Sequence, residues 1–374
     1  MIDYWITLSM MKKLCSLCLA LASGLGSSQA QLDIAHVGNQ FLLSSPLTAS
    51  NSILQSATSL SAPAWIDVTN QLQAGNNTRS TTIPATNTPP VQFYRLFPAT
   101  GMALIPAGSF TMGDSLDGES DAIPTNIFVS TFFMDTNLVS YGQWTSIYAW
   151  ATNRGYAFNH PGSAKATNHP VVFVDWFDTV KWCNARSHLA GLSPAYYTDS
   201  AFTRELTNGE PANVYVSWTA SGYRLPTEAE WEKAARGGAV GLRFPWGNTI
   251  SETQANYNAD TTDYVYDLGP YEGHNTNFDA GSSPYTSPVG YFGPNQYGLN
   301  DMAGNVFVWC TDWYGSTYAQ PTTNNPTGPA SGSQRVIRCG SWVYTANYSR
   351  CANRNDNNAT VTHEGLGFRC VIRQ

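Results

Sequence analysis

Residues 297–309 form the stretch whose residue types best suit a chemical role. In it, Asp301 follows a glycine turn, and the chain breaks again at Gly304 and Asn305 before an alternating apolar run begins at Val306. Such a turn bares backbone carbonyls close to the Asp301 carboxylate, and carboxylate and carbonyl oxygens are the ligands that Ca²⁺ prefers. The run after the break predicts a short buried strand. The alternative interpretation is a plain Gly-Asn turn in a protein core.

Cysteine is the second residue type that could carry chemistry. Seven cysteines are present, of which Cys15 and Cys18 fall in a predicted secretory leader described below. The remaining five are Cys183, Cys310, Cys339, Cys351 and Cys370. An exported protein is expected to pair most of its cysteines, and an odd number leaves at least one free thiol or an intermolecular bond.

Other catalytic arrangements are not visible in the sequence. The histidines lack the H-x-x-x-H and H-E-x-x-H spacings of zinc or iron sites. No G-x-S-x-G hydrolase elbow occurs, and no glycine-rich phosphate loop precedes a predicted helix.

Residues 1–30 predict a secretory signal peptide. A basic start at Met10–Lys13 is followed by the apolar run Leu14–Leu21 and a small-residue cleavage site ending at Ala30. Residues 1–9 are expected to precede the true start, and the apolar run is too short to span a bilayer. We therefore expect an exported protein without a membrane span. The formal net charge of −7 argues against nucleic acid as a partner.

The remaining pattern predicts two regions. Residues 31–100 are polar, with strand-like runs such as Phe41–Leu43, and are expected to form a small all-β module. From residue 101 the pattern predicts a strand at Phe128–Met134. Helices are expected over residues 141–151 and 176–189, and from Thr227 to the glycines at 237–238. Beyond residue 244 glycine, asparagine and proline predict mostly irregular structure. The abundant aromatics, 13% of the chain, are interpreted as core rather than as sugar-stacking platforms.

Several motifs occur in a recognisable order around the 297–309 turn: Ala107–Gly113, Arg224–Gly238, Pro245–Asn248 and Gly367–Arg369. Together they resemble the formylglycine-generating enzyme family, also called the sulfatase-modifying factor family, from about Gly101 to the last residue. The resemblance implies an α+β fold that is related to C-type lectin domains and has little regular secondary structure.

The family's activity depends on two cysteines that bind copper(I) soon after a Gly-Ser-aromatic turn near the C-terminus, and soft thiolates suit this ion. In this chain Tyr344 stands at the first of these positions, and residues 345–350 contain no cysteine. Copper is therefore not expected. We expect Cys351 to form a disulfide with Cys339 or with Cys310. The alternatives are that Cys339 and Cys351 are a displaced copper pair, or that these thiols are unpaired. The resemblance also implies a structural disulfide between Cys183 and Cys370.

Two calcium sites are implied by the same resemblance. The first uses Asp301 and the carbonyls of Gly304 and Val306, but the family's glutamate ligand is Val308 here. Losing one charged ligand should weaken this site. The second site uses Asn256 and the carbonyl of Tyr257, with Asp279 as the expected carboxylate, and we expect it to be the better of the two. The residues that could line a binding cleft are Trp342, Tyr344, Asn347 and Arg354, with Arg354 equally compatible with a scaffold role.

Two functions from different classes follow. The first is a non-catalytic exported module that binds a glycan, a peptide or a cell-surface protein, which the leader, the low charge and the lost ligands favour. The second is an oxidoreductase of the family, acting on a sulfatase cysteine or, without the cysteine pair, on another substrate. Fold resemblance alone does not decide between them.

Overall fold

The computed structural model describes residues 6–7, 33–37, 40–46, 52–57, 66–67, 73–74, 78–84, 93–98, 101–118, 120–316 and 323–373. The chain divides into two compact units, residues 1–100 together with Gln374, and Gly101–Arg373. The predicted signal peptide lies outside the described residues, apart from the backbone of the two-residue strand β1 (Ile6–Thr7).

The described residues of the first unit form two four-stranded antiparallel sheets. The first sheet has the order β1, β8 (Phe93–Pro98), β4 (Ser52–Ala57), β5 (Ile66–Asp67). The second has the order β2 (Asp33–Val37), β3 (Gln40–Pro46), β7 (Thr78–Pro84), β6 (Gln73–Ala74). Leu43 of β3 is fully buried opposite Thr81 of β7. The predicted strand at Phe41–Leu43 is confirmed within β3.

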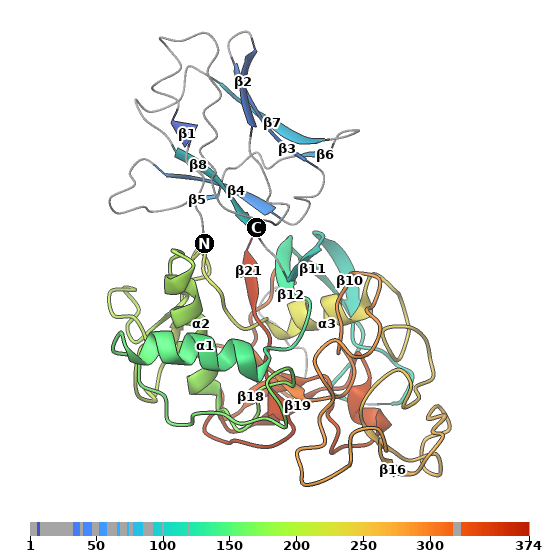
Figure 1. The fold of residues 1–374 in the computed structure, drawn as a ribbon. Coiled ribbons are helices and arrows are strands. Elements are labelled where there is room, and N and C mark those ends of the chain that lie inside the picture. Colours follow the sequence, from blue (N-terminus) through green and yellow to red (C-terminus); the bar gives the residue numbers. More distant parts are fainter. Residues whose placement is uncertain are drawn as a thin grey trace. The chain divides into compact units, whose positions relative to one another are not determined.

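The three predicted helices of the second unit are present, and each starts after a capping residue. Helix α1 (Tyr141–Thr152) starts after Ser140, and α2 (Trp176–Leu189) starts after Asp175; both capping side chains accept a backbone hydrogen bond. The third, α3 (Glu228–Arg236), carries the predicted Thr227–Glu230 capping box and ends at Gly237 in the left-handed conformation, with φ +59°. Figure 1 shows α1 and α2 side by side, with α3 apart from them near β10 and β11.

One predicted strand is two strands in the structure. The run Phe128–Met134 was expected to be continuous, but β11 (Thr125–Val129) pairs with β10 (Gly108–Met112), whereas β12 (Phe132–Asp135) pairs with β9 (Met102–Ile105) and β21 (Val371–Arg373). The chain changes sheets at Ser130 and Thr131, where the Ser130 amide donates to the Asn325 side chain and the Thr131 hydroxyl accepts from the Ala107 amide. The two consecutive polar residues Ser130 and Thr131 interrupt the apolar run at this break, and the prediction of one continuous strand overlooked that signal.

A four-stranded sheet organises the C-terminal part of the second unit. Strand β17 (Phe307–Trp313) lies between β18 (Arg335–Arg338), antiparallel, and β20 (Leu366–Gly367), parallel; β19 (Asn355–Asn357) completes the sheet next to β18. All of β17 except Trp313 is buried, which confirms the buried strand predicted after the 297–309 turn. The remaining short elements are β13 (Tyr196–Tyr197), β14 (Tyr215–Val216), β15 (Asn258–Ala259), β16 (Gly273–His274) and the 3₁₀ helix η3 (Ala346–Ser349).

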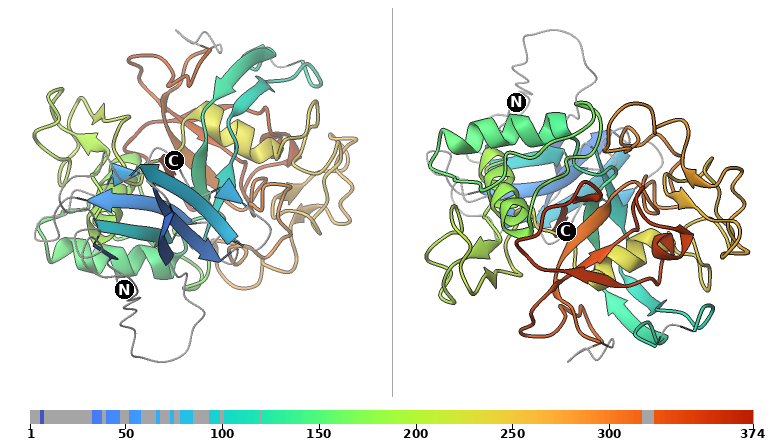
Figure 2. Two further views of the ribbon diagram at one scale, coloured as in Figure 1. Left: turned by 90° about the horizontal axis from the view of Figure 1, so that it is seen from above. Right: turned by 90° about the horizontal axis from the view of Figure 1, so that it is seen from below.

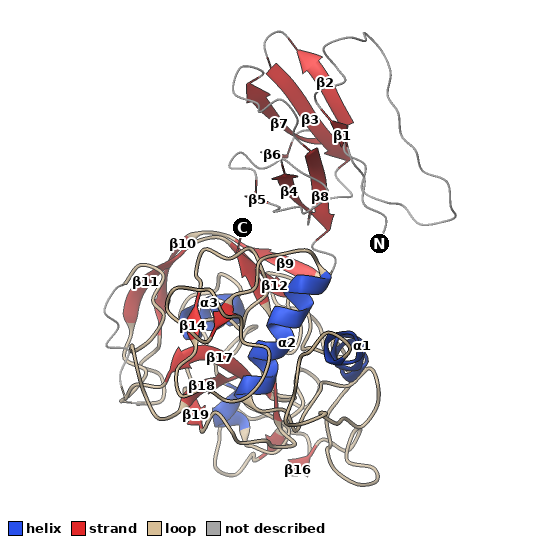
Figure 3. Cartoon of the chain, turned by 90° about the vertical axis from the view of Figure 1, so that its left-hand side faces the viewer, coloured by secondary structure: helices blue, strands red, loops and turns tan. Residues whose placement is uncertain are grey.

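Tryptophan fills much of the core of this unit. Five tryptophans are fully buried, and two of them, Trp144 of α1 and Trp182 of α2, stack with ring centroids 6.0 Å apart. The interpretation of the aromatics as mainly core is thus confirmed for these residues. Loops make up most of the unit, as both views of Figure 2 and the tan segments of Figure 3 show. The α+β class with little regular secondary structure agrees with the prediction.

Candidate functional site

The segment Arg338–Arg354, where the resemblance expects the copper cysteines, is anchored to α3 by buried ion pairs. At its start, the Arg338 guanidinium contacts the Glu232 carboxylate at 2.5 Å, and Glu232 also accepts from Arg236 at 2.8 Å. At its end, Arg354 makes a two-pronged contact with Glu228, with distances of 2.7 and 2.8 Å. Arg354 is buried, so its geometry is that of a scaffold ion pair and not of a residue facing a cleft.

Burial raises the pKa of both candidate copper ligands, Cys339 and Cys351, to about 12. Both thiols are fully buried in one hydrophobic cluster, together with Cys310. The Cys339 thiol donates to the carbonyls of Asp301 and Gly304 at 3.3 and 3.2 Å. Its backbone has φ +102°, a conformation that favours glycine. All three cysteines are thiols in the structure, so a disulfide among them stays untested.

An aromatic platform lies where the first copper cysteine is expected. Tyr344 is 37% exposed, and its ring lies 4.9 Å from that of Tyr348 and 5.4 Å from that of Phe307, measured between centroids. Its backbone carbonyl accepts from the Asn258 amide at 3.1 Å. The Asn347 side chain belongs to the same short helix η3, and its Oδ1 accepts from the Thr345 hydroxyl at 2.6 Å. We call Phe307, Tyr344 and Tyr348 the tyrosine platform.

Trp342, two residues before Tyr344, is 3% exposed. Its indole N–H donates to the carbonyl of Glu364 at 3.1 Å, and its ring packs against those of His274 and Tyr285 at about 5 Å. This contact set is that of a core residue. Of the four expected cleft residues, only Tyr344 and Asn347 therefore offer side-chain surface to solvent.

The first expected calcium site retains an unsatisfied acidic oxygen. Asp301 is buried; its Oδ2 accepts from the Gly290 amide at 2.7 Å, whereas its Oδ1 has no hydrogen bond of normal geometry. Burial raises the pKa of this carboxyl despite the nearby Gly290 amide and Arg369. Gly304 and Val306 follow in the same turn, and the Gly304 carbonyl accepts a hydrogen bond from the Cys339 thiol. The oxygen donors fit Ca²⁺, but Val308 adds none.

In the second expected calcium site, the ammonium group of a lysine contacts the backbone carbonyls. Lys165 Nζ donates to the carbonyls on both sides of Asp279, those of Phe278 and, at 3.0 Å, Ala280. The Asn256 amide donates to the Tyr285 carbonyl at 2.8 Å, and the Tyr257 hydroxyl donates to Asp267. The Asn305 amide donates to the Asn256 carbonyl, which brings Asn256 and Tyr257 close to the first turn. The hydrogen bonds named above do not join either residue to Asp279.

Cys183 of α2 and Cys370 next to β21 are brought together as the resemblance implies. Their sulfur atoms lie 3.5 Å apart in a fully buried contact, and the structure holds both as thiols. The disulfide itself stays a prediction.

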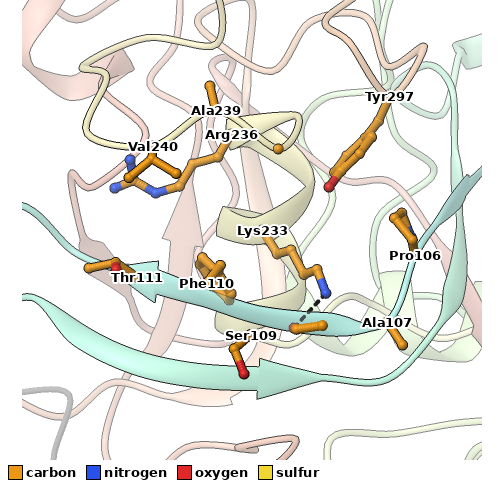
Figure 4. Close-up of a pocket in the computed structure, with 12 residues that line it drawn as sticks. Pro106, Ala107, Ser109, Phe110, Thr111, Lys233, Arg236, Ala239, Val240 and Tyr297 are labelled. Carbon is orange, nitrogen blue, oxygen red and sulfur yellow. Dashed lines mark hydrogen bonds between the residues drawn. The ribbon is translucent and has the colours of Figure 1, made fainter.

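A small pocket between β10 and the end of α3 was not predicted. It has a volume of about 180 Å³, and Lys233 and Tyr297 project into it (Figure 4). Lys233 Nζ donates to the carbonyls of Gly108 and Val129 at 2.8 and 3.2 Å, which ties the hairpin to α3. Burial lowers the pKa of this lysine. The volume is below that of most small-molecule sites, so we interpret the pocket as structural.

The sequence over residues 90–374 matches the family described as the sulfatase-modifying factor enzyme 1-like domain. The chain belongs to this family. Formylglycine-generating enzyme of Mus musculus is 34% identical over 291 residues, which cover 73% of this chain and 75% of the mouse protein. Among solved structures, Treponema denticola variable protein 1 is similar with a TM-score of 0.57 and 26% identity, over 73% of this chain and 95% of that chain.

A second kind of relative is much longer. Serine/threonine-protein kinase pkn1 of Chlamydia pneumoniae is 31% identical over 297 residues, which cover 73% of this chain but only 38% of the kinase. The chain thus spans well under half the length of that relative, and the activity in its name is not carried over.

Within this sulfatase-modifying factor domain, sequence reasoning missed the partners of Tyr344. Tyr348 follows four residues later, and this spacing could have suggested a shared face. Phe307 comes from β17, and nothing in the sequence connects it with Tyr344.

Proposed function

We propose that this sulfatase-modifying factor domain is a recognition module that binds a glycan through the tyrosine platform, and that it is not a formylglycine generator. The observation that carries the proposal is the exposed Tyr344 at the position where the family's first copper thiolate is expected. A phenol ring cannot replace a soft thiolate ligand of copper(I). An exposed aromatic ring, in contrast, is a common stacking surface for apolar faces of a ligand.

The state of the cysteines supports the non-catalytic half of the proposal. In the part of the chain that the structure describes, all five cysteines are buried. A reactive cysteine needs a thiolate that is accessible and favoured by its surroundings, and burial of Cys339 and Cys351 opposes both conditions.

The position of polar groups supports a ligand with hydroxyls. Asn347 stands in η3 between Tyr344 and Tyr348 in sequence, so an amide accompanies the aromatic faces. An aromatic face beside an amide can stack on a sugar ring and exchange hydrogen bonds with its hydroxyl groups. Export through the predicted leader would bring the module to extracellular glycans. Among the described residues, no helix is long and apolar enough to cross a membrane.

Glycan binding can be tested with the mature chain from Gln31 on immobilised glycans, compared with Tyr344→Ser and Tyr215→Ser. Tyr215 is the matched control, because it is 36% exposed on β14 of the same unit. We expect retention to fall on the order of tenfold in Tyr344→Ser, since full burial of a large apolar side chain contributes roughly 1.5–3 kcal/mol and a ligand covers only part of the ring. Retention should stay unchanged in Tyr215→Ser. An equal loss of retention in both variants would overturn the glycan assignment. So would a protein that is retained on immobilised peptides but not on immobilised glycans.

Catalysis can be tested in parallel with a Cys-x-Pro-x-Arg peptide, copper(I) and oxygen, with mass spectrometry as the readout and an active formylglycine-generating enzyme as the control. We expect no conversion of the peptide cysteine. Conversion would overturn the non-catalytic proposal and point to Cys339 or Cys351 as displaced copper ligands.

A further inference from the structure

Two aspartates and one histidine, which no sequence motif connects, lie together at the start of α2. Asp175 is the N-cap residue of this helix, Asp178 lies in its first turn, and His160 comes from the loop after α1. One ligand atom of each residue lies within 4.8 Å of those of the other two. His160 Nδ1 is 2.9 Å from Asp178 Oδ2 and 3.6 Å from Asp175 Oδ2.

Within the cluster, both oxygens of the Asp178 carboxylate accept hydrogen bonds, whereas one oxygen of the Asp175 carboxylate accepts none. Asp178 accepts from the backbone amides of Asn159 and His160 at 2.9 and 3.0 Å. Asp175 uses Oδ1 to cap the helix, accepting from the Asp178 amide at 2.7 Å. Its Oδ2 is completely buried, has no hydrogen-bond partner and faces His160. An unpaired buried carboxylate oxygen is costly, so this atom calls for a partner.

The charges around the cluster also leave a deficit of positive charge. Lys181, itself fully buried, lies 3.0 Å from Asp178 Oδ1 and can balance one of the two carboxylates. Glu210, which accepts from the Asn159 side chain, adds further negative charge nearby.

We propose that His160 Nδ1, Asp175 Oδ2 and Asp178 Oδ2 bind one divalent transition-metal ion of the zinc class. An imidazole nitrogen with two carboxylate oxygens suits Zn²⁺, Mn²⁺ or Fe²⁺ better than Ca²⁺, which takes oxygen ligands. Metal–ligand bonds of about 2.1 Å place neighbouring ligands roughly 3.0–3.5 Å apart. The observed separations of 2.9 and 3.6 Å require only small movements.

Access and the tautomer of the histidine fit this arrangement. The His160 side chain is 36% exposed, whereas both carboxylates are fully buried, so an ion can enter past the imidazole. A neutral His160 with its proton on Nε2 presents the Nδ1 lone pair to the ion. Three protein ligands leave coordination positions for water. The cluster shares no residue with the expected calcium or copper sites.

The test is calorimetric titration of Zn²⁺ into the full mature chain, purified without a polyhistidine tag. The variants are His160→Gln, Asp175→Asn and, as the matched control, His188→Gln at the other end of α2. Asp175→Asn is informative because asparagine caps a helix as well as aspartate does, so α2 keeps its start. We expect one ion per wild-type chain, binding weakened on the order of tenfold or more in the first two variants, and unchanged binding in His188→Gln.

A second readout is the visible absorption of the Co²⁺-loaded protein, which reports the coordination sphere directly. It should change in His160→Gln and Asp175→Asn but not in the control. Absence of stoichiometric Zn²⁺ binding in the wild type, or equal affinity in all variants, would show that the cluster is only a hydrogen-bonded histidine–aspartate pair. If His160→Gln fails to fold, as judged by circular dichroism, Asp175→Asn alone decides.

Discussion

The Sγ atoms of Cys183 in α2 and Cys370 at the C-terminal strand lie 3.5 Å apart, although the two residues are 187 positions apart in the sequence. We propose that they form a disulfide if the predicted leader exports the protein. In the chain-entropy account, closing so long a loop would stabilise the fold by roughly 4–5 kcal/mol. Differential alkylation with mass spectrometry should find this pair oxidised. Reductant should then lower the melting temperature of the wild type but not of a Cys183→Ser/Cys370→Ser double variant. Equal sensitivity of both proteins would contradict the disulfide.

Gly304→Ala is expected to destabilise the protein much more than Gly298→Ala. Both glycines have similar left-handed conformations, with φ +76° and +78°, so each alanine should cost roughly 1–2 kcal/mol for its backbone. An added Cβ at Gly304 would also lie 2.4 Å from the Asn256 carbonyl oxygen, whereas none of the neighbouring atoms lies within 4 Å at Gly298. We expect this clash to cost roughly 1–3 kcal/mol more. Denaturant unfolding of the two variants measures the difference, and equal costs would exclude the close approach.

Calcium is expected to bind at the Asp301 turn and not at Asp279. The unpaired Oδ1 of Asp301 provides an acidic ligand there, while Lys165 already occupies the carbonyls beside Asp279. Calcium at about 100 times its Kd should raise the free energy of unfolding by about 2.7 kcal/mol. Asp301→Asn should abolish this calcium-dependent shift of the melting temperature, and Asp279→Asn should leave it unchanged. The reverse result would place the ion at the second site.

The stability of the α3 anchor should fall in acid because of Glu232. Burial alone would raise the pKa of Glu232, but Arg236 and Arg338 outweigh it and hold the pKa below the ordinary value of 4.5. A depressed pKa in the folded state contributes stability that is complete above the unfolded value and is lost as the pH falls through the folded value.

The variant Glu232→Gln tests this linkage. At pH 7 it should lose roughly 3–5 kcal/mol, because two buried guanidiniums lose their shared partner. The difference in unfolding free energy between wild type and variant should stay constant down to about pH 5 and then shrink below pH 4.5. A difference that does not change with pH would show that Glu232 keeps an ordinary pKa.

Features that depend on neighbours within a few residues could be predicted before the fold was known. The capping box of Thr227 and Glu230, the left-handed stop at Gly237 and the buried strand after Gly304 were all predictable, because their hydrogen bonds and apolar periodicity are local. The motif order was sufficient to predict the family. The sequence also showed that position 344 holds a tyrosine where the resemblance expects a cysteine.

Contacts between residues far apart in the chain became visible with the folded structure. It paired Arg354 with Glu228 across 126 positions, buried Cys339 and joined Phe307 to the platform of Tyr344. It also brought His160 to the start of α2, a contact that no histidine spacing predicted. These contacts depend on the paths of irregular loops, which have no periodicity that a sequence pattern could reveal, and on hydrogen bonds that form only when the whole domain has packed.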